Sequence, residues 1–130
     1  MRVEVPIGDV VDRVTILRLK VARLRSPAAQ ANAARELSAL EAAWEAEGLP
    51  PLDSLPETAP LAACNARLWE VEDALRACEA RGDFGPDFVA LARAVYQTND
   101  ARARWKRDIS TRLGSRLIEE KGYGAETDAR

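Results

Sequence analysis

The sequence predicts an all-α protein, either an antiparallel four-helix bundle or a set of helical hairpins. Apolar residues recur three and four positions apart in four long segments, which is the spacing of one face of a helix. Proline and glycine gather at the ends of these segments and between them. The chain has 130 residues, 47% of them hydrophobic and 31% charged, which is the size and composition of one folded domain.

The first helix is predicted over residues 8–25, after a short extended N-terminal arm that ends at Pro6. Asp9 and Asp12 lie in its first turn, where the helix dipole favours acidic side chains. Its apolar stripe has a spacing like that of a coiled coil and consists of Ile7, Val10, Val14, Leu17, Val21 and Leu24.

The second helix is predicted to begin at Ser26, which suits an N-cap and is followed by Pro27 at the first helical position. Gly48 suits the left-handed residue that ends a helix. Residues 49–60 contain four prolines, a density that no helix tolerates. This segment is therefore predicted to be an ordered or semi-rigid loop.

Two further helices are predicted over residues 60–81 and 86–113, each followed by a glycine. A short helical piece is expected over residues 115–121. Residues 122–130 are expected to form a flexible, frayed polar tail. The predicted organisation is one helical domain, residues 1–121, followed by this tail, residues 122–130.

Charge and hydropathy limit the classes of partner. The formal net charge is -2, which gives no argument for nucleic acid or an anionic membrane as a partner. No apolar run approaches the roughly 18 residues of a membrane span. Glu4, Asp9 and Asp12 lie where a signal peptide needs an apolar core. We therefore expect a cytoplasmic protein that contacts neither a membrane nor nucleic acid.

The sequence contains no histidine, which removes histidine-based acid–base catalysis, nucleophilic triads and most zinc sites. Cys64 and Cys78 lie on one predicted helix, about 21 Å apart at 1.5 Å per residue, too far for a disulfide within that helix. Any chemistry would come from carboxylates, arginine, lysine, tyrosine or the backbone. No metal site and no cofactor are predicted.

The apolar stripe of the fourth predicted helix is interrupted by Thr98 and Arg102. A charge is rarely buried without a partner, so Arg102 either faces a wet cleft or pairs with a carboxylate of another helix. The candidate carboxylates are Glu72, Asp73 and Asp12.

Two interpretations of this interruption stay open. In the first, Arg102, Lys106 and Arg76 grip a phosphate or carboxylate. Asn99 and Thr98 would then orient this anion. In the second, the polar residues form an internal ion-pair layer that sets the register of the helices.

Several short blocks of sequence, in one order along the chain, resemble a known family. They are residues 7–17 (IGDVVDRVTIL), 68–73 (LWEVED), 83–84 (DF), 96–102 (YQTNDAR), 106–107 (KR) and 119–121 (EEK) with Tyr123. The chain resembles a family of small, all-helical bacterial proteins of unknown function, over nearly its whole length. The resemblance implies a helix start in which Asp9 replaces a glutamate and Pro6 replaces a capping serine. It implies no activity.

Polar residues of three predicted helices form the candidate binding site, and all of them except Arg76 lie in blocks of the resemblance. These residues are Asp12, Thr15, Glu72, Asp73, Arg76, Tyr96, Thr98, Asn99, Asp100, Arg102 and Lys106. The sequence does not decide whether a reaction is catalysed, and it favours a non-catalytic module that binds a protein partner or a small anionic ligand through this polar cluster.

Two alternatives remain. One is a metal-dependent hydrolase or transferase acting on a nucleotide or sugar phosphate, with Asp100 or Glu72 as base or magnesium ligand. The other is a structural homodimer with an internal ion-pair layer.

Overall fold

The structure is a computed structural model that describes residues 1–124. It contains four α-helices and one 3-10 turn, in the order α1 (Ile7–Arg23), α2 (Pro27–Ala46), η1 (Leu52–Ser54), α3 (Thr58–Arg81) and α4 (Pro86–Arg112). No strand occurs within the described residues. The all-α prediction is confirmed, and residues 1–6 form the extended arm expected before α1.

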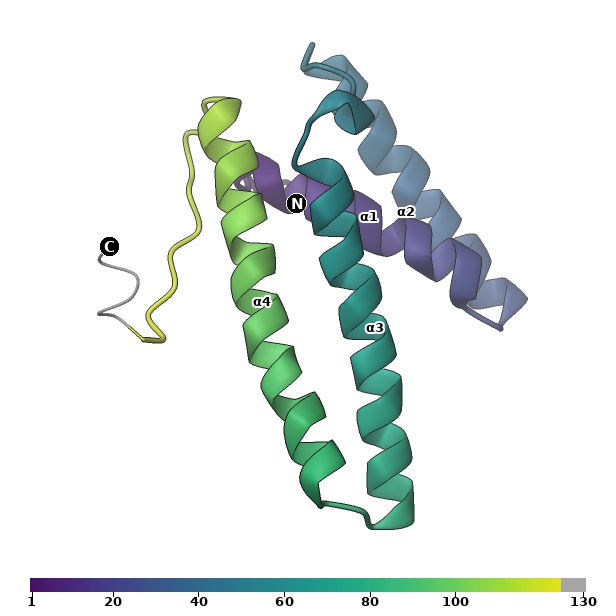
Figure 1. The fold of residues 1–130 in the computed structure, drawn as a ribbon. Coiled ribbons are helices and arrows are strands. Elements are labelled where there is room, and N and C mark those ends of the chain that lie inside the picture. The colour runs from purple at the N-terminus through teal and green to yellow at the C-terminus, as the bar shows by residue number, and fades with distance from the viewer. Residues whose placement is uncertain (125–130) are drawn as a thin grey trace.

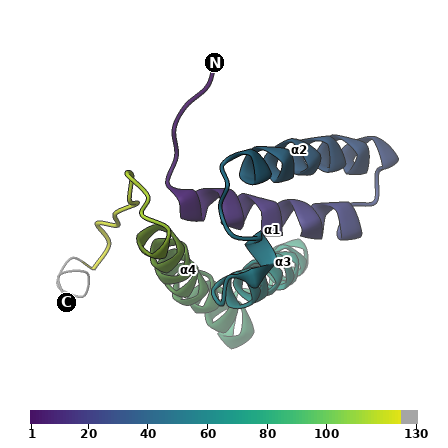
Figure 2. The ribbon, with the colours of Figure 1, turned by 90° about the horizontal axis from the view of Figure 1, so that it is seen from above.

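The helices form two hairpins. Helices α3 and α4 lie antiparallel, side by side, and the α1–α2 hairpin crosses them near the end of α4 and the start of α3 (Figures 1 and 2). Helix α1 packs against all three other helices. The half of the α3–α4 hairpin that leads to its connecting turn extends beyond α1 and α2 (Figure 1).

The core lies where α1 is enclosed by its neighbours. Its buried members are Val11, Val14, Trp44, Leu52, Leu55, Leu61 and Ile109. Val11 was not in the predicted stripe of the first helix, yet it is fully buried. A single stripe describes a helix with one covered face, whereas α1 has α2 on one side and α3 with α4 on another.

The proline-rich loop is ordered. The indole Nε1 of Trp44 donates a hydrogen bond to the carbonyl oxygen of Pro50 at 2.8 Å, which ties the loop to α2. Helix α3 begins at Thr58 rather than at Pro60. Pro60 is tolerated there because an amide in the first turn has no intrahelical acceptor.

The short helix predicted over residues 115–121 is absent, and this prediction is wrong. These residues run back along α4 without helical structure (Figure 1). A helix of seven residues is not stable by itself. Here its backbone bonds are replaced by contacts such as the 2.6 Å hydrogen bond from Ser115 Oγ to the Leu117 carbonyl. We call residues 115–121 the strap.

Only residues 122–124 of the predicted tail belong to the described chain, and residues 125–130 lie outside it. None of the described helices combines the length and the hydropathy needed to cross a membrane.

Candidate functional site

The site begins where the N-terminus of α1 meets α4. A Cβ on Gly8 would lie 2.1 Å from the backbone oxygen of Lys106, so only glycine allows this approach. The amide of Gly8 donates to Ser110 Oγ at 2.8 Å, and the amide of Ile7 donates to Ser115 Oγ at 3.1 Å. The cap that Pro6 cannot supply therefore comes from Ser110 of α4 and Ser115 of the strap. The acidic first turns of α1 lie against Arg102 and Lys106 of α4.

Asp12 is the partner of Arg102. The guanidinium donates from Nε to Asp12 Oδ1 at 2.8 Å and from Nη2 to Oδ2 at 2.5 Å, a two-point pair. The Asp12 side chain is 8% exposed and that of Arg102 is 27% exposed. The hydrogen bond with Asp12 raises the pKa of Arg102 despite the opposing effect of its burial. Of the three candidate carboxylates, the structure selects the one on α1.

Asn65 of α3 completes this arrangement, and the sequence reasoning missed it. Its Nδ2 donates to Asp12 Oδ1 at 3.0 Å and to Thr15 Oγ1 at 2.9 Å. Thr15 Oγ1 in turn donates to the Asp12 carbonyl at 2.8 Å. Asn65 lies one turn after the buried Leu61, and this helical spacing was the only signal in the sequence that could have marked it as buried.

Asn99 joins through a longer contact, accepting from Arg102 Nη1 at 3.4 Å. We call Asp12, Thr15, Asn65, Asn99 and Arg102 the polar layer.

Lys106 lies one turn further along α4 and is almost enclosed, with a side chain 13% exposed. Its Nζ is 2.9 Å from Glu119 Oε2 of the strap and 3.3 Å from Asp9 Oδ1 of α1. Burial by itself would lower the pKa of Lys106. The hydrogen bond to Glu119 and the charges of Asp9, Asp12 and Glu119 outweigh burial and raise it. Neither Asp9 nor Glu119 was among the predicted site residues.

The strap contacts α4 at further points. Arg107 Nη1 donates to the Glu119 carbonyl at 3.3 Å and to Glu120 Oε1 at 2.8 Å. Lys121 Nζ lies 3.5 Å from Asp100 Oδ1. Asp100, a predicted site residue, therefore pairs with the strap and lies outside the polar layer.

The remaining predicted residues lie elsewhere on the α3–α4 hairpin. Glu72 pairs with Arg76 one turn along α3, on the exposed surface. Asp73 is exposed, and Tyr96 is 54% exposed. The polar cluster predicted as one unit is thus divided between the crossing of the two hairpins and the half of α3–α4 that extends beyond it.

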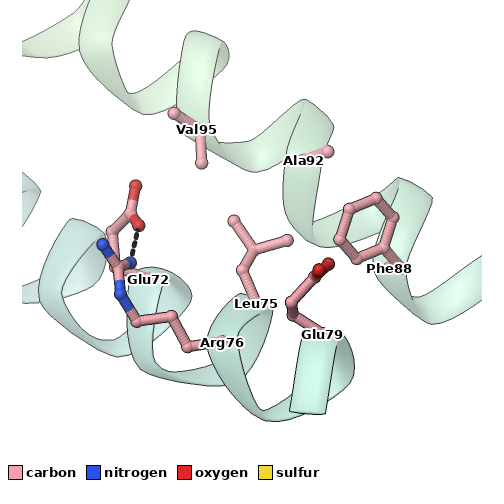
Figure 3. A pocket seen from close by; sticks show the side chains of 7 residues that line it. All are labelled: Glu72, Leu75, Arg76, Glu79, Phe88, Ala92 and Val95. Atoms are coloured by element: carbon pink, nitrogen blue, oxygen red, sulfur yellow. Dashed lines mark hydrogen bonds and ion pairs between the residues drawn. The ribbon is translucent and has the colours of Figure 1, made fainter. Parts of the chain in front are cut away.

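That half carries a shallow groove, which we call the hairpin groove. Its apolar lining comes from both helices: Leu75, Phe88, Ala92 and Val95. Glu72, Arg76 and Glu79 of α3 complete the lining. Figure 3 shows Leu75 directed from α3 toward the α4 side chains, with the Glu72–Arg76 pair beside it.

A second shallow hollow lies between α3 and α4, with Thr98, Cys64 and Arg67 among its lining residues. Burial raises the pKa of the Cys64 thiol, although the charges of Arg102 and Arg104 oppose this effect. A thiol with a raised pKa holds little thiolate at neutral pH, so Cys64 is a poor nucleophile.

The charged groups at the crossing neutralise one another. Arg102 is satisfied by Asp12, and Lys106 lies between two carboxylates. Within residues 1–124, no three cysteine, aspartate or glutamate side chains converge in a way that could hold a metal ion. These contacts join α1 to α3 and α4 where the two hairpins cross.

Fold and site together define a class: a small all-α protein of two crossed hairpins, joined by a buried polar layer. The family of unknown function DUF6165 matches residues 1–129, and the chain belongs to this family. No curated protein and no solved structure shows a significant match to the chain.

Proposed function

We propose that this protein is a non-catalytic helical module that binds a protein partner in the hairpin groove, and that the partner presents an amphipathic helix with basic flanks. The observation that carries this proposal is the partly apolar hairpin groove, which lies on the half of α3–α4 that extends beyond α1 (Figure 1).

The groove continues a face that already receives a helix. Arg102 and Lys106 on α4 contact α1 through Asp12 and Asp9. Phe88, Ala92 and Val95 precede them at helical spacing and lie on the same face of α4. Helix α1 thus occupies one part of this face, and a second helix is the ligand whose shape fits the rest. Recognition of this kind places an apolar helix face in an apolar groove.

Charge favours a basic partner. Arg76 is already paired with Glu72, so Glu79 leaves the rim of the groove with a net negative charge.

Apolar side chains on and beside the hairpin turn are exposed, at 54% for Phe84 and 51% for Val89. An exposed apolar surface with a charged rim is typical of a protein interaction site.

The polar layer has a supporting role in this proposal: it sets the crossing angle and leaves the groove open. The two carboxylates that an enzymatic mechanism would use are each paired, Glu72 with Arg76 and Asp100 with Lys121. The expected cytoplasmic location stays a prediction.

The experiment compares two synthetic helical peptides of about 20 residues, long enough to hold helical structure. Both carry the same leucine stripe, and one has lysine flanks where the other has glutamate. Fluorescence anisotropy measures their binding to the wild-type protein and to two variants. Ala92→Arg fills the groove, whereas Ala90→Arg places the same charge on another exposed face of the same helix.

We expect the lysine peptide to bind at least about tenfold more tightly than the glutamate peptide. Ala92→Arg should abolish this binding, and Ala90→Arg should preserve it. Equal affinity for both peptides would contradict the basic partner. Light scattering tests whether the protein forms a dimer. A dimer that dissociates in Ala92→Arg but not in Ala90→Arg would identify the occupant of the groove as a second copy of the chain and overturn the proposal.

A further inference from the structure

We infer that Lys106 and Arg107 form a binding site for a small dicarboxylate, and that Glu119 and Glu120 of the strap occupy this site when the ligand is absent. The site lies at the crossing of the hairpins and is independent of the hairpin groove.

The two glutamates have the chemistry of such a ligand. They are adjacent in sequence, and their carboxylates contact adjacent cations of α4: Glu119 Oε2 lies 2.9 Å from Lys106 Nζ, and Glu120 Oε1 lies 2.8 Å from Arg107 Nη1. A molecule with two carboxylates a few bonds apart would make the same pair of contacts.

Lys106 takes its closest anionic partner from outside the helical core. Its Nζ lies 2.9 Å from Glu119 Oε2 of the strap and 3.3 Å from Asp9 Oδ1 of α1. The Asp9 Oδ1 atom makes no hydrogen bond within the described residues, so its contact with Lys106 is an ion pair without a hydrogen bond. The Lys106 side chain is 13% exposed with the strap in place, and without the strap its ammonium group would meet solvent and retain only this longer contact. An incoming carboxylate would replace the lost partner of Lys106 with another charged acceptor.

Two other ion pairs of the strap are exposed and weak enough to be exchanged. The Arg107–Glu120 pair has side chains 50% and 72% exposed, and the Arg116–Glu4 pair has side chains 72% and 53% exposed. Exposed ion pairs of this kind contribute little to stability. Leu117 and Ile118 are half-buried and hold the strap in place when no ligand is present.

The charges at the crossing also suit exchange of one anion for another. Without the strap, Asp9 and Asp12 balance Arg102 and Lys106, and Arg107 is left as an unneutralised cation beside them. A dicarboxylate then supplies the charges that Glu119 and Glu120 supply in the closed state.

The test is a titration of the full chain with glutarate at low ionic strength, followed by amide chemical shifts. Acetate and the neutral diamide of glutarate serve as ligand controls. The strap competes with the ligand, so its weakening should raise the apparent affinity. We expect Glu119→Gln to bind glutarate at least about fivefold more tightly than the wild type, with shifts centred on residues 103–107 and the strap. The matched control, Glu79→Gln, removes an exposed carboxylate in the hairpin groove and should bind as the wild type does.

Lys106→Gln in the Glu119→Gln background should lose the binding. If that variant fails to fold, Arg107→Gln provides the second test, because Arg107 lies at an exposed position. Its affinity for glutarate should be at least about fivefold lower. Unchanged affinity in Glu119→Gln would overturn the inference. So would shifts that map away from α4 and the strap, or acetate and glutarate binding equally well. Ala92→Arg should bind glutarate normally, so this site and the hairpin groove can fail separately.

Discussion

Asp12 and Arg102 lie ninety positions apart in the chain and meet in a two-point ion pair where the two hairpins cross. Asn65 of a third helix donates to the same carboxylate at 3.0 Å. The pair and Asn65 therefore join α1, α3 and α4 at one point, so loss of the pair should lower the stability of the whole domain.

Replacing Arg102 by alanine should lower the free energy of unfolding by about 3 kcal/mol, because it leaves the Asp12 carboxylate buried and uncompensated. Urea unfolding measures this change. Arg102→Lys should recover only part of it, since an ammonium cannot make the two-point contact. Arg104→Ala, at an exposed position of the same helix, is the matched control. Similar losses for Arg102→Ala and Arg104→Ala would show that the pair adds nothing.

Gly8→Ala should destabilise the protein by about 3 kcal/mol, because the new Cβ would overlap the backbone of α4 and force the helices apart. Gly85→Ala is the control, since its Cβ would meet only the Asp83 side chain at 3.4 Å. Thermal unfolding of both variants checks the prediction. A Gly8→Ala protein as stable as Gly85→Ala would mean that α1 can move away from α4 at little cost.

Ser110→Ala should cost about 1–2 kcal/mol, because it leaves the buried amide of Gly8 without an acceptor. Ser38→Ala, an exposed serine of α2, should change stability little. Hydrogen exchange provides a second readout, since the Gly8 amide should lose protection in Ser110→Ala. Retained protection there would contradict the role assigned to Ser110 as the cap of α1.

The stabilising contribution of Lys106 should disappear at high pH. Its pKa in the folded protein is raised above the usual 10.5, so folding favours the protonated form. This contribution is fully present below pH 10.5 and is lost as pH rises through the higher folded-state pKa. The measurement is the difference in free energy of unfolding between the wild type and Lys106→Gln across pH. It should stay constant from neutral to mildly alkaline pH and shrink only above that value. A difference that already falls near neutral pH would indicate a lowered pKa and contradict the prediction.

The sequence anticipated much of the fold because helix boundaries depend on local chemistry. Ser26 accepts a hydrogen bond from the Ala29 amide as an N-cap, and Gly82 ends α3 with a φ of 65°. The strap shows the limit of such reasoning. Residues 115–121 have helical composition, but contacts with Lys106 and Arg107 of α4 hold them in a non-helical path.

For the site, Thr98 and Arg102 were both singled out as interruptions of an apolar stripe, and only Arg102 belongs to the polar layer. Thr98 instead lines a hollow elsewhere on the α3–α4 hairpin. An apolar stripe predicts which face of a helix is covered, but it does not predict which neighbouring helix covers each part of that face. The sequence offered Glu72, Asp73 and Asp12 as partners for Arg102, and only the way α1 crosses α4 shows that the partner is Asp12.

The sequence by itself determined that the chain is helical, where most helices begin and end, and that a charge on α4 requires a partner. These properties follow from side-chain periodicity and caps, which act over a few residues. Only the tertiary structure decided that α1 crosses α3 and α4, that Asp12 and Asn65 meet Arg102, and that half of the α3–α4 hairpin keeps an open groove. Those outcomes depend on how helices pack, and the close approach at Gly8 sets where α1 lies on α4.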